Sequence, residues 1–124
     1  MLRKTVEIDG KSVPFQSSAA IPRMYRIKFK RDIFKDIERL ENSYKERDDG
    51  TKELEIEDLE IFENVAYIMA LHANPTIPAT IEGWLDEFEM FSIYQVLPEI
   101  LELWGSNLYS EIEAKKNIAT LSGN

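Results

Sequence analysis

The stretch "EDLEIFENVAYIMALHA", residues 57–73, decides the fold because it is the most apolar helical segment of the chain. One broad face is made by residues at helical spacing, namely Leu59, Phe62, Val65, Ala66, Met69 and Ala73. That face is widened almost to the full circumference by Ile61, Ile68 and Leu71. A helix that is apolar nearly all round is usually central and buried. The sequence therefore predicts a domain built around this helix, which should end at Asn74-Pro75.

Upstream, "KTVEIDGKSVPFQ", residues 4–16, predicts a β-hairpin. Apolar and polar residues alternate on both sides of Asp9-Gly10, a pair that accepts the positive φ of a type I′ turn. Pro14 cannot donate a ladder hydrogen bond, so the second strand should be an edge there. Because two strands alone are marginally stable, the hairpin is expected to lie on helices or to pair with another chain.

Helices are expected over about residues 22–107. Pro22 suits the first position of one helix, and Asp32 could cap the next, although the pattern leaves open whether residues 22–45 form one helix or two. Thr80 can cap a helix whose apolar side runs from Ile81 to Phe91, and Ser92-x-x-Gln95 has the form of a capping box. Pro98 predicts either a kink or a new helix that starts there, with Gly105 as the C′ residue.

The predicted fold class is therefore mainly α (α+β), with an N-terminal β-hairpin followed by four to six helices in one compact domain of residues 1–110. A length of 124 residues suits one domain, and a hydrophobic content of 44% is too high for a disordered chain. Residues 111–124 are polar and are expected to form a flexible C-terminal tail.

Composition and charge limit the compartments and the kinds of partner that are expected. There is no cysteine, no apolar run long enough to cross a membrane, and no signal peptide at the N-terminus, so a cytoplasmic protein is expected. The net charge of −8 is uneven, because residues 1–31 carry a net +6 and residues 32–110 a net −14. Either the two parts neutralise each other within the fold, or the polarised charge attracts a basic partner or a second copy of the chain, head to tail.

No catalytic, cofactor or metal site is predicted. The lone histidine, His72, has no second His or Cys to complete a zinc site, and its place near a helix end favours a role at the helix dipole. The loop of residues 45–53 carries Lys45 and Arg47 where a calcium loop needs oxygen ligands. The basic segment "PRMYRIKFKR" could contact nucleic acid, but the acidic remainder would repel a phosphate backbone.

Three motifs resemble the small tail assembly chaperones of long-tailed phages and prophages of Gram-positive bacteria. They are Pro22-Arg23-x-Tyr25-Arg26, then residues 31–36 ("RDIFKD"), then Trp84-Leu85-x-x-Phe88, and the resemblance runs from about Val6 to Gly105. It implies a non-enzymatic role in tail assembly: binding the tape measure protein, and the major tail tube protein as a second partner, in the bacterial cytoplasm without entering the virion. It also implies a longer, frameshifted form of the chain, for which the codons of Lys115–Asn117, in "AKKN" at residues 114–117, offer a candidate slippery run.

The client surface is expected on the last two helices, where apolar positions are bordered by acids. The candidate partner-binding residues are Trp84, Asp86, Glu87, Met90, Tyr94, Glu99 and Trp104. Met69 is expected in the core and Met90 at the surface. The rival functions are a regulatory protein-binding module, such as an acidic DNA mimic, and a structural tail or connector subunit. A homo-oligomer is also expected from the open hairpin edge and the polarised charge.

Overall fold

The computed structural model describes residues 2–48, 55–90 and 92–104, with the side chains of residues 44–48 left out. The elements are β1 (Leu2–Ile8), β2 (Lys11–Ser17), α1 (Ile21–Phe29), α2 (Ile33–Asp48), α3 (Ile56–Ala73), α4 (Ile81–Leu85) and the 3₁₀ helix η1 (Ser92–Val96). Residues 97–104 continue as a helix. An antiparallel hairpin followed by helices confirms the expected α+β class. The predicted tail, the C′ residue Gly105 and the charged loop about Gly50 lie outside the described residues.

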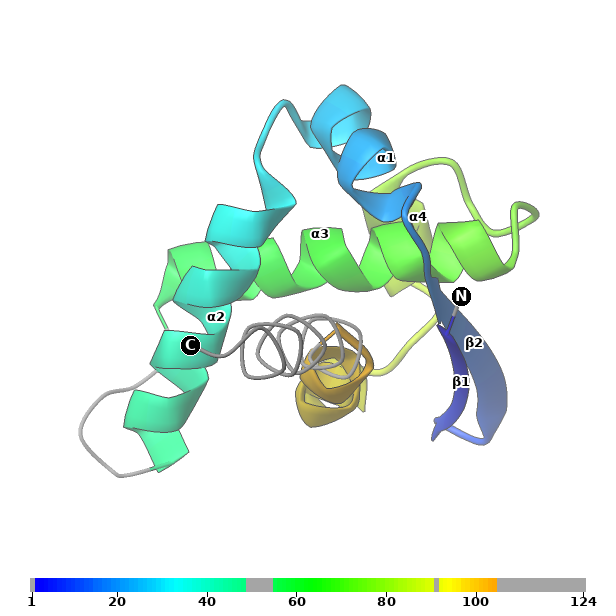
Figure 1. Cartoon of the computed structure of the whole chain (residues 1–124). Coiled ribbons are helices and arrows are strands. Elements are labelled where there is room, and N and C mark those ends of the chain that lie inside the picture. The colour runs from blue at the N-terminus through cyan, green and yellow to red at the C-terminus, as the bar shows by residue number, and fades with distance from the viewer. Residues whose placement is uncertain (1, 49–54, 91, 105–124) are drawn as a thin grey trace, which may run out of the picture.

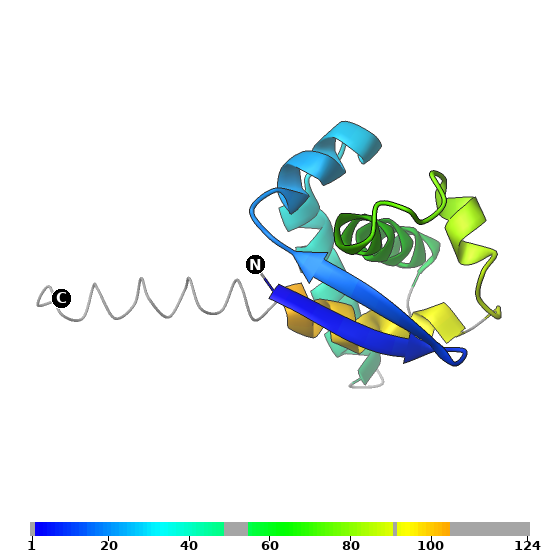
Figure 2. The same ribbon diagram turned by 90° about the vertical axis from the view of Figure 1, so that its right-hand side faces the viewer.

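Helix α3 is the centre of the fold, as its sequence predicts. In Figure 1 it crosses the middle of the molecule, and in Figure 2, seen nearly along its axis, the other elements surround it. Its buried apolar residues are Ile61, Phe62, Val65, Ala66, Tyr67, Ile68, Met69 and Ala70. Met69 is 0% exposed, as expected for a core methionine. The helix ends at Ala73, and the C-cap residue Asn74 has the extended backbone (φ −145°) that is favoured before a proline.

The hairpin forms where the sequence predicts it. Asp9 and Gly10 both have positive φ, 55° and 76°, as a type I′ turn requires. The register pairs Ile8 with Lys11 and Thr5 with Pro14. Because hydrogen-bonded and non-hydrogen-bonded pairs alternate from the turn, Pro14 falls at a non-hydrogen-bonded position and costs the ladder nothing. The hairpin lies on helices: β2 contacts α3, and β1 contacts η1.

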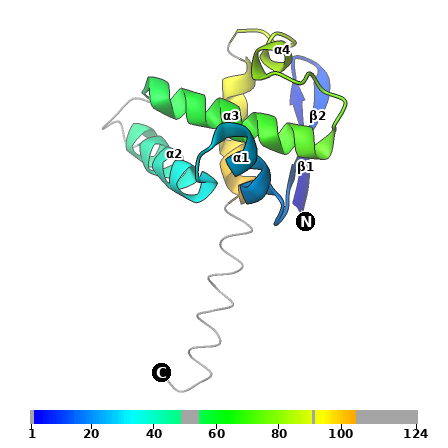
Figure 3. The ribbon, with the colours of Figure 1, turned by 90° about the horizontal axis from the view of Figure 1, so that it is seen from above.

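Residues 22–45 form two helices, which answers the question that the pattern left open. Helix α1 stops because Lys30 adopts the left-handed conformation (φ 59°), while its N–H still donates to the Arg26 carbonyl at 2.9 Å. Asp32 then accepts a hydrogen bond from the Phe34 N–H at 2.9 Å, so it caps α2 as predicted. This break turns α2 across the N-terminal half of α3 (Figure 3).

A buried carboxylate joins α2 to the start of α3. Asp58 is 0% exposed and accepts hydrogen bonds from Arg39 Nε and Ser43 Oγ, both at 3.0 Å, and from the Glu55 N–H at 2.9 Å. Burial raises the pKa of Asp58, but these hydrogen bonds outweigh it and hold the pKa below its ordinary value. The ionised side chain therefore caps α3 and ties it to α2 at once.

The C-terminal part departs from its pattern after α4. Thr80 caps α4 as predicted, accepting from the Gly83 N–H at 3.1 Å, but α4 ends at Leu85 instead of continuing to Phe91, which itself lies outside the described residues. After α4 the hydrogen bonding changes to the tighter 3₁₀ pattern, in which the Phe88 N–H donates to the Leu85 carbonyl three residues back. Pro98 lies in the first turn of the helix over residues 97–104, which follows η1, so the structure supports the predicted alternative of a new helix near Pro98.

Candidate interaction site

Both tryptophans belong to the core, which corrects their assignment to a partner surface. Trp84 is 1% exposed, and its ring lies 5.7 Å from Tyr67, 5.3 Å from Phe88 and 6.5 Å from Phe15. Trp104 is 6% exposed and lies 5.4 Å from Phe34. Neither ring is accessible to a partner in this fold. A helical stripe in the sequence could not separate these core rings from surface ones, because α3 and β2 cover Trp84 from far along the chain.

Tyr94 and Glu99 also have partners within the chain. The Tyr94 hydroxyl donates to Glu63 Oε2 at 2.7 Å, and this bond, with burial, raises the pKa of Tyr94 to about 12. Glu99 forms an ion pair with Lys4, whose Nζ also lies 3.1 Å from Glu102. These two residues therefore help to attach residues 92–104 to the rest of the fold, and only part of each is open to solvent.

Of the seven predicted partner-binding residues, only three are exposed. Asp86, Glu87 and Met90 are exposed, and so is Glu89 between them. Met90 is 78% exposed, which confirms its expected place at the surface. We call these four residues the acidic patch: three carboxylates beside one exposed apolar side chain.

The hairpin turn holds the acidic patch in place. Asp9 accepts a hydrogen bond from the Glu89 N–H at 2.8 Å and another from the Ser92 hydroxyl. The bond from Ser92 and then that from Glu89 keep the pKa of Asp9 below its ordinary value. Lys11 Nζ donates to the Glu87 carbonyl at 2.7 Å. The turn motif predicted the hairpin but carried no signal for these contacts, which join residues about 80 positions apart.

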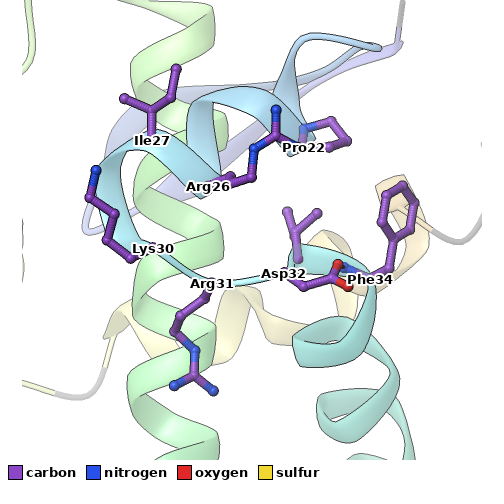
Figure 4. A pocket seen from close by; sticks show the side chains of 8 residues that line it. Pro22, Arg26, Ile27, Lys30, Arg31, Asp32 and Phe34 are labelled. Carbon is purple, nitrogen blue, oxygen red and sulfur yellow. The ribbon is translucent and has the colours of Figure 1, made fainter.

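A second surface lies at the junction of α1 and α2 and includes part of the basic segment of residues 22–31. A groove of about 690 Å³ is lined by Pro22, Arg26, Ile27, Lys30, Arg31, Asp32, Ile33 and Phe34. Figure 4 shows Arg26 and Ile27 on α1 and Phe34 at the start of α2. Ile27 is 56% exposed and Phe34 is 54% exposed. We call it the basic groove, because cations and exposed apolar side chains share its walls.

A buried network fixes the shape of the basic groove. Asp36 is 5% exposed and accepts hydrogen bonds from Arg31 Nε (2.8 Å), Arg31 Nη2 (2.9 Å) and the Tyr25 hydroxyl (2.6 Å). Burial raises the pKa of Asp36, but the bonds from Arg31 and Tyr25 outweigh it and lower the pKa overall. Burial and the Asp36 contact raise the pKa of Tyr25. These three residues lie within the motifs that carry the family resemblance.

The opposite charges of the two parts are only partly paired within the fold. Lys4 reaches Glu99 and Glu102, and Arg31 lies 3.7 Å from Glu57. Arg26 and Lys30, in contrast, form no ion pair with any described residue. Within the described part of the chain, these two cations of α1 are therefore not balanced by a carboxylate in direct contact.

The lone histidine, His72, forms a hydrogen bond with Ser18. His72 lies in the last turn of α3, where a partial positive charge is favourable, and its Nε2 is 2.8 Å from Ser18 Oγ. Through the described part of the chain, no three His, Asp or Glu side chains gather to hold a metal ion. No helix among those described residues has the length and apolar character needed to cross a bilayer.

Comparison with models of protein families, with curated proteins and with solved structures found no match to this chain.

Proposed function

We propose that the protein is a non-enzymatic tail assembly chaperone, which binds the tape measure protein of a long-tailed phage and keeps it soluble. Tail tube subunits are its second partner. It acts in the cytoplasm of the bacterial host and does not enter the mature virion. The proposal starts from the family resemblance. The fold supports it through exposed apolar side chains that lie next to charged residues.

One observation carries the proposal. Ile27, Phe34 and Met90 are large apolar side chains, yet each of them is more than half exposed. Exposed apolar residues rimmed by polar ones are typical of sites that bind proteins. An amphipathic helical client can place its apolar face on such anchors. A long and largely helical client such as a tape measure protein has this character.

The pattern of carboxylates argues against the alternative function of an acidic DNA mimic. A mimic needs unpaired acids that follow the spacing of phosphates along one face. Several acids here are already bonded to cations within the chain, among them Asp36, Asp58 and Glu99. The open cations of the basic groove would also repel a basic, DNA-binding partner. A structural tail subunit, the remaining rival, would be found in purified virions.

The proposal is tested by co-expression with the candidate tape measure protein, followed by size-exclusion chromatography with light scattering. We expect the client to become soluble and to co-elute with the chaperone. The Met90→Ser and Ile27→Ser variants should each retain less client than the wild type. Ile56→Ser is the matched control, because Ile56 is 85% exposed and lies at the start of α3, outside both surfaces. A client that aggregates as much with the chaperone as without it would refute the proposal.

A further inference from the structure

The hairpin has one edge whose backbone groups are open to a new strand. Bonded and non-bonded pairs alternate from the turn, beginning with the hydrogen-bonded pair of Ile8 and Lys11. The backbone N–H and C=O groups of Arg3, Thr5 and Glu7 therefore point away from β2. Within the described part of the chain, no backbone hydrogen bond reaches these groups from another element. Such an edge can accept an added strand.

The other edge of the hairpin is not equivalent. Pro14 occupies the middle of the three outward positions of β2, opposite Thr5 of β1. Because proline has no N–H, a continuous ladder cannot form along that edge. Figure 2 shows the hairpin in front of α3 and of residues 92–104, with no further described strand beside β1. A third strand therefore has to join the sheet at β1.

An acidic pocket lies beside the β1 edge. It has a volume of about 190 Å³ between β1 and η1, and its walls include Val96 and the carboxylates of Glu7, Asp9 and Glu99. Among the described residues, only Glu99 of these three acids forms an ion pair, with Lys4. The pocket therefore keeps an excess of negative charge. It is smaller than the roughly 300–1,000 Å³ of small-molecule sites, so it suits a single long side chain.

We propose that the β1 edge binds an extended, basic segment of a partner protein, one with Lys or Arg at alternate positions. The segment adds to the sheet as a third strand along Arg3, Thr5 and Glu7, and one of its cations enters the acidic pocket. Backbone hydrogen bonds supply the affinity of such a complex, and the pocket supplies the preference for a basic side chain. This site is separate from the basic groove, and its occupant is extended where the client of the proposed function is helical.

A defined peptide is the probe. It is a fluorescein-labelled heptapeptide that alternates lysine with threonine or valine, and fluorescence anisotropy at low salt measures its affinity. One control peptide carries glutamate in place of every lysine. A second control is the lysine peptide methylated on its three central backbone nitrogens, which keeps the charge but removes hydrogen-bond donors from both of its edges.

Two matched pairs of variants test the protein side. Thr5→Pro removes the central outward N–H of β1 and takes no ladder bond from the hairpin, whereas Thr5→Val keeps that N–H. Gln95→Arg places a cation at the acidic pocket from an exposed position. Glu60→Gln makes the same change in net charge at an exposed position of α3. Circular dichroism verifies that each variant is folded.

We expect the wild type, Thr5→Val and Glu60→Gln to bind the lysine peptide, less tightly as salt is raised. Thr5→Pro, and methylation of the peptide, should each weaken binding at least about tenfold, because each removes strand pairing from one side. Gln95→Arg, and the glutamate peptide, should each weaken it about threefold or more. If Thr5→Pro does not fold, the methylated peptide makes the same test on the unaltered protein.

Three results would overturn the inference. The first is a wild type that leaves the anisotropy of the lysine peptide unchanged. The second is equal binding of the methylated peptide, which would mean attraction of charge without strand addition. The third is a lower mass of Thr5→Pro than of the wild type in sedimentation equilibrium without peptide, which would mean that a second copy occupies the edge. No tape measure protein is present, so failure here is distinct from failure of the proposed chaperone function.

Discussion

Arg31 binds Asp36 through two parallel hydrogen bonds, from Nε at 2.8 Å and from Nη2 at 2.9 Å, across the break between α1 and α2. This paired geometry is the strong form of the arginine–carboxylate contact. The Tyr25 hydroxyl adds a third bond to the same carboxylate from α1. One buried charge therefore sets how α1 meets α2, and with it the shape of the basic groove.

Asp36→Asn should lower the free energy of unfolding by about 2–4 kcal/mol, because Arg31 and Tyr25 lose their anionic acceptor while remaining partly desolvated. Urea unfolding followed by circular dichroism measures this loss. Glu38→Gln is the control, since Glu38 is exposed on the same helix, and it should stay within about 0.5 kcal/mol of the wild type. Equal effects of the two changes would mean that the network is not stabilising.

Acid should weaken the fold through Asp36 and Asp58, the buried carboxylates of the described residues. The folded-state pKa values of Asp36 and Asp58 both lie below the ordinary 3.8. Their stabilisation is therefore fully present above the ordinary value and is lost as pH falls through the lower folded-state values. The urea midpoint should drop between about pH 5 and pH 2.5. The decrease should be smaller in Asp36→Asn, which has already lost one of the two groups; an identical decrease would exclude Asp36 as a source.

Within residues 83–105, substitutions of core and of surface side chains should differ clearly in their effect on the free energy of unfolding. Trp84→Ala should cost about 3–5 kcal/mol, because it empties a packed site among Phe15, Tyr67 and Phe88. Met90→Ala should change the free energy of unfolding by less than about 0.5 kcal/mol. Chemical denaturation of both variants makes the comparison. A mild effect at Trp84 would mean that this ring is not part of the core.

Asp9 should control how firmly residues 89–92 are held. Asp9→Asn keeps a side chain that tolerates the positive φ of the turn but removes the carboxylate that binds Glu89 and Ser92. Hydrogen exchange at the Glu89 amide should become faster, because its acceptor is neutral and weaker. Exchange at buried amides of α3, such as Val65, should change much less. Unaltered protection at Glu89 would show that the turn does not hold this segment.

The acidic patch should contribute to client binding through charge. The double change Asp86→Lys/Glu87→Lys should weaken binding of the tape measure protein and reduce the dependence of affinity on salt. The control Glu7→Lys/Glu60→Lys alters the net charge equally at exposed positions elsewhere. Glu99 is left unchanged, because its ion pair with Lys4 joins elements of the fold. If the affinity and its salt dependence are unchanged, the acidic patch is not part of the client-binding surface.

Local signals in the sequence were sufficient for much of the local structure. Asp9-Gly10 specified the hairpin turn, residues 57–73 specified the central helix, and Asp32 and Thr80 each capped the helix that follows them. These predictions succeeded because the responsible interactions span at most a few residues. Turn geometry, caps and apolar periodicity act within such distances whatever the rest of the chain does.

The tertiary structure decided which apolar and charged residues remain available. The sequence predicts both Trp84 and Met90 on the partner surface, but α3 and β2 bury Trp84 and only Met90 is exposed. The sequence also could not pair Arg31 with Asp36, because the break at Lys30 removes them from any single helical face. Burial and long-range pairing depend on elements that lie far apart in the chain and meet only in the folded state. The sequence by itself therefore determined the hairpin, the central helix and the polarised charge, whereas only the packing around α3 decided where the basic groove and the acidic patch lie.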